Sequence, residues 1–263
     1  MLYHARNSRI SGTDYIRFGT GSRTLIILPG LGDGLQTVKG TALPMAWMYR
    51  IFAKDFTVYM FSRRSDLPQG HTTRNMAQDL KDTMDALGIQ KADILGVSMG
   101  GMIAQWLAID HPEKVDHLIL AVTAARPNPI LNESIEEWIA QARQNDHRAL
   151  MAGNLYKIYS EDYCRKNSWM IPILGVVTKP KSYTRFLIQA EACLNHNAYS
   201  HLSCIHAPTL VMGGEQDQAL GSEASREIAN EISDAQLKMY PQWGHGLYEE
   251  AKDFNRLVYD FLK

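Results

Sequence analysis

Short apolar runs alternate along the chain with longer segments whose apolar residues recur at helical spacing. Six such runs are typical of strands buried on both faces of a sheet, at residues 24–28, 56–61, 92–97, 117–122, 208–212 and 236–240. The first twenty residues, divided by Ser11-Gly12, predict a hairpin ahead of these strands. Helical spacing occupies residues 73–87, 99–110, 222–232 and 250–262. The alternation predicts an α/β fold with a mostly parallel, doubly wound sheet.

One long stretch, residues 126–206, breaks this alternation because it contains no convincing strand. Pro127 and Pro129 open it, and helical spacing follows at residues 132–145, 147–159, 161–170 and 182–194. A structureless loop of about 80 residues would be implausible in a compact fold. We therefore expect a helical cap insertion at 126–206, within a core formed by residues 1–125 and 207–263.

The strand expected at residues 92–97 leads directly into Gly96-Val97-Ser98-Met99-Gly100-Gly101, and a helix follows. A serine on such a sharp turn has a strained backbone, and the flanking glycines avoid collisions with neighbouring backbone. The turn exposes the Ser98 hydroxyl and aims the N-terminus of the helix at the reacting centre. Ser98 is therefore the candidate nucleophile, and a glycine-rich turn used only for packing is the alternative.

A serine nucleophile needs a general base, which an acid orients. His245 comes just after the last expected strand and lies between two glycines, so we prefer it to the other eight histidines as the base. Asp217 comes just after the fifth expected strand and is the preferred acid; Glu215 competes with it, and a turn role is the alternative. The chain order Ser98, Asp217, His245 is the one that a strand–serine–helix motif predicts.

The turn Pro29-Gly30-Leu31-Gly32-Asp33-Gly34 follows the first expected strand, and its glycines let the backbone approach a ligand closely. In such an arrangement this loop and the residue after the nucleophile donate the two oxyanion-binding N–H groups. The backbone amides of Leu31 and Met99 are therefore the candidate oxyanion hole. The turn matches neither common phosphate-binding glycine motif, and we expect no cofactor and no metal.

Composition and charge narrow the functional class. The net charge of −1 argues against a nucleic-acid binder, which would need a basic face. The three cysteines, Cys164, Cys193 and Cys204, include no CxxC pair, so neither a zinc site nor a disulfide framework is expected. No apolar run approaches the roughly 18–20 residues of a membrane span, and the N-terminus lacks the pattern of a signal peptide. We expect a cytoplasmic protein that acts on a small acyl molecule, with its oligomeric state left open.

Four motifs, in this order, resemble those of the α/β-hydrolase superfamily: Leu28-Pro29-Gly30-Leu31-Gly32, Gly96-Val97-Ser98-Met99-Gly100-Gly101, Gly214-Glu215-Gln216-Asp217 and Gly244-His245-Gly246. The stretch at 126–206 resembles the helical cap of small esterases and lactonases in that family. The resemblance implies the α/β-hydrolase fold, with Ser98 as nucleophile, His245 as base and Asp217 as the acid that orients it. The stretch 62–71 lacks the Asp-x-Arg-Gly-x-Gly usual in relatives, so the nearest subfamily does not assign the substrate.

The leading hypothesis is hydrolysis of a small carboxylic ester, thioester or lactone through an acyl-enzyme. Two alternatives stay open, because relatives with the same triad include C–C bond hydrolases and a lyase of menaquinone synthesis, and others are ligand receptors or signalling partners with slow turnover. Arg126, at the end of the fourth expected strand, is one candidate contact for an anionic group. A surface or hinge arginine is the other interpretation of that residue.

Overall fold

The computed structural model describes residues 2–263, except for the side chains of residues 2 and 174. Within this range the chain forms an eight-stranded sheet in the order β1-β2-β4-β3-β5-β6-β7-β8. The first two pairings in that order are antiparallel and the others are parallel, which confirms the expected class. The strands are β1 (Arg6–Ile10), β2 (Thr13–Phe18), β3 (Arg23–Leu28), β4 (Phe56–Phe61), β5 (Ala92–Val97), β6 (Val115–Ala121), β7 (Thr209–Gly214) and β8 (Gln236–Tyr240).

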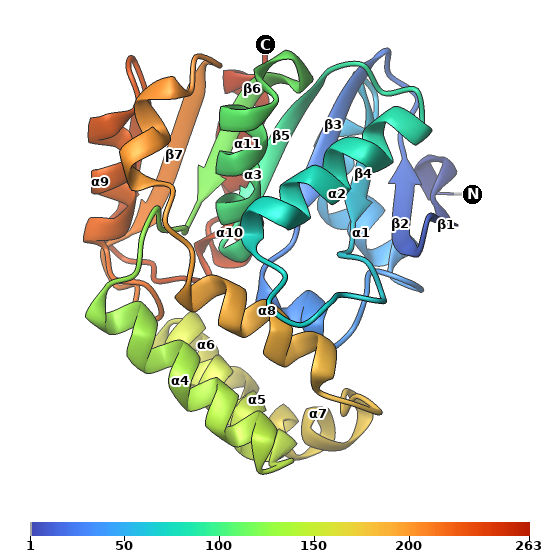
Figure 1. The fold of residues 1–263 in the computed structure, drawn as a ribbon. Helices are drawn as coiled ribbons and strands as arrows, with labels where there is room; N and C mark the ends of the chain where they lie inside the picture. The colour runs from blue at the N-terminus through green and yellow to red at the C-terminus, as the bar shows by residue number, and fades with distance from the viewer. Residues whose placement is uncertain (1) are drawn as a thin grey trace.

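Helices lie on both faces of the sheet (Figure 1). Between the helices and the sheet lie two hydrophobic cores, one on each face. Along β3, Ile26 belongs to one core whereas Leu25 and Ile27 belong to the other, as the alternation of side chains along a strand requires. The first core is covered by α2 (Thr73–Ala86), α3 (Met99–Asp110) and α9 (Glu223–Glu231). The second is covered by α1 (Ala42–Met48), α10 (Leu247–Glu250) and α11 (Phe254–Phe261).

The α-helices of residues 126–206, called the helical segment below, lie together at one end of the sheet, at the bottom of Figure 1, and the last residues of the segment return beside α3 and α9 to the start of β7. Polar side chains begin three of its helices: Asn128, Asp146 and Ser160 each accept a hydrogen bond from a backbone N–H of the first turn. Its helices are α4 (Pro129–Arg143), α5 (His147–Ile158), α6 (Glu161–Asn167), α7 (Ile171–Val177) and α8 (Thr184–Leu194). None of the helices in the described range has the length and apolar character needed to cross a bilayer.

The structure differs from the sequence-based expectations in a few elements. β6 begins at Val115, so His117 lies inside the strand and not at its edge. The helix expected at 250–262 is α11, which begins only at Phe254, and the separate short helix α10 precedes it. Two short helices were not expected, α1 and α7: Pro44 interrupts the apolar pattern of the first, and Pro172 and Gly175 interrupt that of the second.

Candidate active site

Ser98 lies at the sharp turn between β5 and α3. Its backbone has a φ of 54° and a ψ of −122°, a sparsely populated conformation for a residue with a side chain. Hydrogen bonds hold this conformation: the Ser98 N–H donates to the Ala121 carbonyl at 2.9 Å, and the Ser98 carbonyl accepts from the Gly101 N–H at 2.8 Å. The Thr123 hydroxyl also donates to the Ser98 carbonyl, at 2.7 Å. Hydrogen bonds at both the N–H and the carbonyl of Ser98 therefore hold its backbone in the strained conformation.

The glycines around Ser98 are required by close backbone approach. A Cβ on Gly96 would lie 2.6 Å from the Gly100 carbonyl oxygen, and a Cβ on Gly100 would lie 2.0 Å from the Leu28 carbonyl oxygen. A Cβ on Gly30 would lie 3.3 Å from the Cβ of Ser98. The turn after β3 and the turn after β5 thus touch at the nucleophile, which the glycine spacing in the sequence predicts.

Asp217 and His245 form a buried pair. His245 Nδ1 lies 2.9 Å from Asp217 Oδ2, and both side chains are almost fully buried. The other carboxylate oxygen, Asp217 Oδ1, accepts hydrogen bonds from the N–H groups of Ala219 and Leu220, each at 2.9 Å. These three contacts fix the orientation of the carboxylate. Asp217 can therefore hold one ring nitrogen of His245 and leave the other free.

The loops after β7 and β8 are joined by a hydrogen bond and by close packing, which places Asp217 beside His245. The Gln216 N–H donates to the Trp243 carbonyl at 3.1 Å. A Cβ on Gly214 would lie 2.4 Å from the same carbonyl oxygen, so the two loops pack closely there. Glu215, the competing acid, points elsewhere and forms an ion pair with Arg226. The geometry thus favours Asp217 over Glu215 as the partner of His245.

A cavity of about 340 Å³ lies beside Ser98 and His245. Leu31 also lines it, and the Leu31 and Met99 amides each occupy the first position of a helix, where the N–H has no partner within the helix. In the described part of the chain no hydrogen bond joins Ser98 Oγ to His245. Catalytic hydrogen bonds often form only when substrate is bound, so the absence of this bond does not exclude the pair. The two residues line the same cavity.

Sequence reasoning did not identify most of the cavity walls. The helical segment contributes Trp138 of α4 together with three residues at the end of α5, and further walls come from α1 and α10. The residues not expected there are Met45, Met48, Tyr49, Asn154, Ile158, Tyr159, Tyr248 and Glu249. The large side chains among residues 45–49 were the available signal in the sequence.

Asp33, Arg63 and Arg185, called the Asp33 cluster below, join the helical segment to the loops after β3 and β4. Arg185 of α8 forms an ion pair with Asp33 Oδ2 and donates to the Asp33 and Arg63 carbonyls. The Arg63 N–H donates to Asp33 Oδ2 at 3.1 Å, and its guanidinium donates to the Pro29 carbonyl at 2.6 Å. Burial lowers the pKa of Arg63, and the charge of Asp33 opposes that shift. The cluster holds the turn that carries Leu31.

Other candidate residues lie away from the cavity. Arg126 forms an ion pair with Glu227 and stacks on Tyr199, so the interpretation as a surface arginine is the better one. His196 is buried beside Thr73, with its Nδ1 2.9 Å from the Thr73 hydroxyl. Burial lowers the pKa of His196 to about 3, so its ring is neutral near pH 7.

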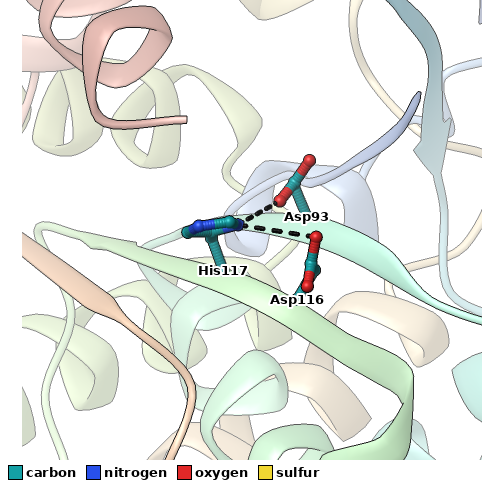
Figure 2. Close-up of side chains that lie close together, drawn as sticks. All are labelled: Asp93, Asp116 and His117. Atoms are coloured by element: carbon teal, nitrogen blue, oxygen red, sulfur yellow. Dashed lines mark hydrogen bonds and ion pairs between the residues drawn. The ribbon is translucent and has the colours of Figure 1, made fainter. Parts of the chain in front are cut away.

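One group of potential metal ligands lies at the opposite end of β5 from Ser98. Figure 2 shows one edge of the His117 ring facing both Asp93 and Asp116. Its Nδ1 lies 2.7 Å from the Asp93 carboxylate and 3.7 Å from that of Asp116. Cationic side chains already neutralise both acids, since Arg23 lies 2.8 Å from Asp93 and Lys91 lies 2.9 Å from Asp116. These contacts indicate an ion-pair network that joins neighbouring strands.

Comparisons with known proteins agree with the fold and the site described above. The family model for the alpha/beta hydrolase fold matches residues 23–252. A putative carbamate hydrolase, RutD, of Caulobacter sp. (strain K31) is 26% identical over 91% of this chain and 90% of that protein. The 2-hydroxy-6-oxo-6-phenylhexa-2,4-dienoate hydrolase of Comamonas testosteroni is 28% identical over 82% of this chain and 77% of that protein.

Solved structures agree on the fold. The enol-lactonase from Burkholderia xenovorans LB400 superposes with a TM-score of 0.81 at 24% identity, covering 98% of this chain and 99% of that chain. The expected enzyme class, a hydrolase of this fold, is confirmed by these relatives together with the family model. The chain belongs to the α/β hydrolase family.

Proposed function

We propose that the chain hydrolyses a small carboxylic acid derivative, an ester, thioester or lactone, through an acyl-enzyme on Ser98. The observation that carries the proposal is the strained Ser98 turn, which shares one cavity with the buried His245–Asp217 pair. A serine becomes nucleophilic only beside a base, and the base needs an acid that fixes its tautomer. Carbamates have the same acyl centre, and the name of the RutD relative is consistent with such chemistry.

The mechanism follows from these positions. His245 takes the Ser98 proton as Oγ bonds to the acyl carbon, and Asp217 stabilises the resulting imidazolium. The tetrahedral oxyanion accepts hydrogen bonds from the Leu31 and Met99 amides. When the carbon–leaving-group bond breaks, His245 returns the proton to the leaving group. A water molecule then loses a proton to His245 and attacks the acyl carbon. The bond from the acyl carbon to Ser98 Oγ breaks, His245 returns the proton to Oγ, and the acid leaves.

We further propose that the helical segment, residues 126–206, is a cap on a core formed by residues 1–125 and 207–263. Support comes from the cavity, since Trp138 and the end of α5 form one wall of it. Closing the site in this way excludes water around the acyl group and strengthens the electrostatic interactions with the oxyanion.

Carbon–carbon bond hydrolysis is less favoured by the cavity. The Comamonas relative is named for a dienoate, which is a carboxylate anion. The described residues that line the cavity include no Lys or Arg that could hold such a group. The acyl-transfer reaction needs no such cation.

The direct test is hydrolysis of p-nitrophenyl acetate and butyrate by Ser98→Ala. We expect kcat to fall by at least about a thousandfold while the far-UV circular dichroism spectrum is retained. The exposed Ser203 offers a matched control, and Ser203→Ala should keep native turnover. Native turnover by Ser98→Ala would show that the proposed mechanism is wrong.

A further inference from the structure

The cavity beside Ser98 contains a carboxylate that no cation neutralises. Of the described residues that line it, the ionisable acids and bases other than tyrosine are Asp33, His245 and Glu249. Asp33 is paired with Arg63 and Arg185. Glu249 forms no ion pair within the described residues, and its Oε2 accepts a hydrogen bond from the Tyr159 hydroxyl at 2.8 Å. Glu249 therefore presents to the cavity a carboxyl group that has no cationic partner among the described residues.

Three tyrosines lie around this carboxylate. Tyr49, Tyr159 and Tyr248 all line the cavity with Glu249, and we call these four residues the polar corner. Burial, followed by nearby charges that include Glu249, raises the pKa of all three phenols, so they stay neutral and keep their O–H groups. Glu249 is exposed at the rim of the cavity; desolvation by its neighbours raises its pKa, and the Tyr159 hydrogen bond opposes that shift.

The neighbouring Glu250 has a different role. Its two carboxylate oxygens accept hydrogen bonds from the N–H of Ser160, at 3.0 Å, and from the hydroxyl of Ser160, at 2.5 Å. These bonds fix the junction between α5 and α6 on α10, and Glu250 is not among the residues that line the cavity. The pair of adjacent acids thus offers one carboxylate at the rim of the cavity and one matched carboxylate that does not line it.

We propose that the polar corner selects acyl groups that carry a hydroxyl or a protonated amino group, and that Glu249 disfavours acyl groups that end in a carboxylate. A donor on the acyl group can hydrogen-bond to the Glu249 carboxylate, and a charge-assisted bond of that kind is stronger than a neutral one. A carboxylate on the acyl group would meet a like charge with no Lys or Arg in the lining to offset it. This inference rests on the proposed function and names the substrate class of the same site.

Four ethyl esters of similar acyl length test the selectivity: ethyl butyrate, ethyl 3-hydroxybutyrate, ethyl β-alaninate and monoethyl succinate. Proton release in a pH-stat at pH 7.5 gives kcat/KM for each ester. We expect the hydroxyl and amino esters to exceed ethyl butyrate, and monoethyl succinate to fall at least about tenfold below it. A tenfold change corresponds to about 1.4 kcal/mol, which is within what like charges a few ångströms apart near a protein surface produce.

Glu249→Gln removes the charge and keeps the shape. In this variant the ratio of kcat/KM for monoethyl succinate to that for ethyl butyrate should rise at least about tenfold. Glu250→Gln is the matched control, and it should leave the ratio within about threefold of the native value.

Two results separate this inference from the proposed function. Ser98-dependent hydrolysis of all four esters with equal kcat/KM, or a ratio that Glu249→Gln leaves unchanged, would overturn the selectivity and leave the mechanism intact. Failure of the native protein to hydrolyse any of the four esters would contradict the proposed function, and the selectivity would fall with it.

Discussion

Replacing Arg185 with methionine should destabilise the protein strongly, because it removes the cation from the helical segment that pairs with Asp33. The Asp33 side chain is 1% exposed and that of Arg185 is 14% exposed, so solvent cannot replace the lost partner. The variant also loses the hydrogen bonds from Arg185 to the Arg64 carbonyl, at 3.1 Å, and to the Arg63 carbonyl, at 2.9 Å. The three carbonyls and the carboxylate that Arg185 contacts all belong to the loops after β3 and β4.

The magnitude follows from the partners that remain. Breaking a buried ion pair by removing one partner costs about 3–5 kcal/mol. In Arg185→Met the Asp33 carboxylate keeps the Arg63 N–H at 3.1 Å, and Arg63 Nη1 lies 3.7 Å away. Because this second guanidinium still offsets part of the charge, we expect the lower end of that range, about 3 kcal/mol in the free energy of unfolding.

Urea unfolding at pH 7, followed by tryptophan fluorescence, measures the effect. Arg143→Met is the matched control within the helical segment, since Arg143 pairs with Glu191 at 3.2 Å and its side chain is 63% exposed. That exposed pair should contribute less than about 1 kcal/mol. If Arg185→Met lost no more stability than Arg143→Met, the Asp33 cluster would not hold the helical segment to the core as described.

Further predictions concern the proposed acid, a buried histidine and the thiols. Asp217→Asn should lower kcat for ester hydrolysis by about 10⁴-fold, since the wrong tautomer of the base would be held, and a loss under tenfold would exclude the role. Burial lowers the pKa of His196 from 6.5 to about 3, so in this range the folded protein keeps the ring neutral while the unfolded chain takes up a proton. The free energy of unfolding should therefore fall as the pH is lowered through this range. Between pH 7 and pH 5 this histidine should lower the free energy of unfolding in urea by about 2 kcal/mol. If His196→Gln lost as much stability as the native protein over this range, the assignment would be wrong. A thiol reagent such as DTNB should modify Cys204 alone in the native protein, because Cys164 and Cys193 are buried. Modification of a second thiol as fast as that of Cys204 would contradict their burial.

The sequence predicted those features that depend on short-range signals. Apolar runs identified the six core strands, and the glycines around Ser98 identified the turn because a side chain at Gly96 or Gly100 would collide with nearby backbone. The order of the motifs indicated the fold, because each follows a strand and the carboxyl ends of parallel strands meet at one edge of the sheet.

The cavity walls depend on long-range placement and could not be predicted. Asp33 and Arg185 are separated by 152 residues, and no local pattern marks them as partners. Glu249 and Glu250 are adjacent and chemically identical, and only the packing of α10 against α5 directs one into the cavity and the other onto Ser160. The short helix α1 was missed because Pro44 lies inside it, although its last turn lines the site.

The central claim is that Ser98 is an activated nucleophile, and labelling with a fluorophosphonate tests it most directly. The Ser98 hydroxyl should displace fluoride from phosphorus only if His245 accepts its proton, so covalent attachment reports the working site. Mass spectrometry of the digested native protein should place the label on the peptide that contains Ser98, and His245→Ala should abolish labelling. A label on any other residue, or native labelling by Ser98→Ala, would contradict the account.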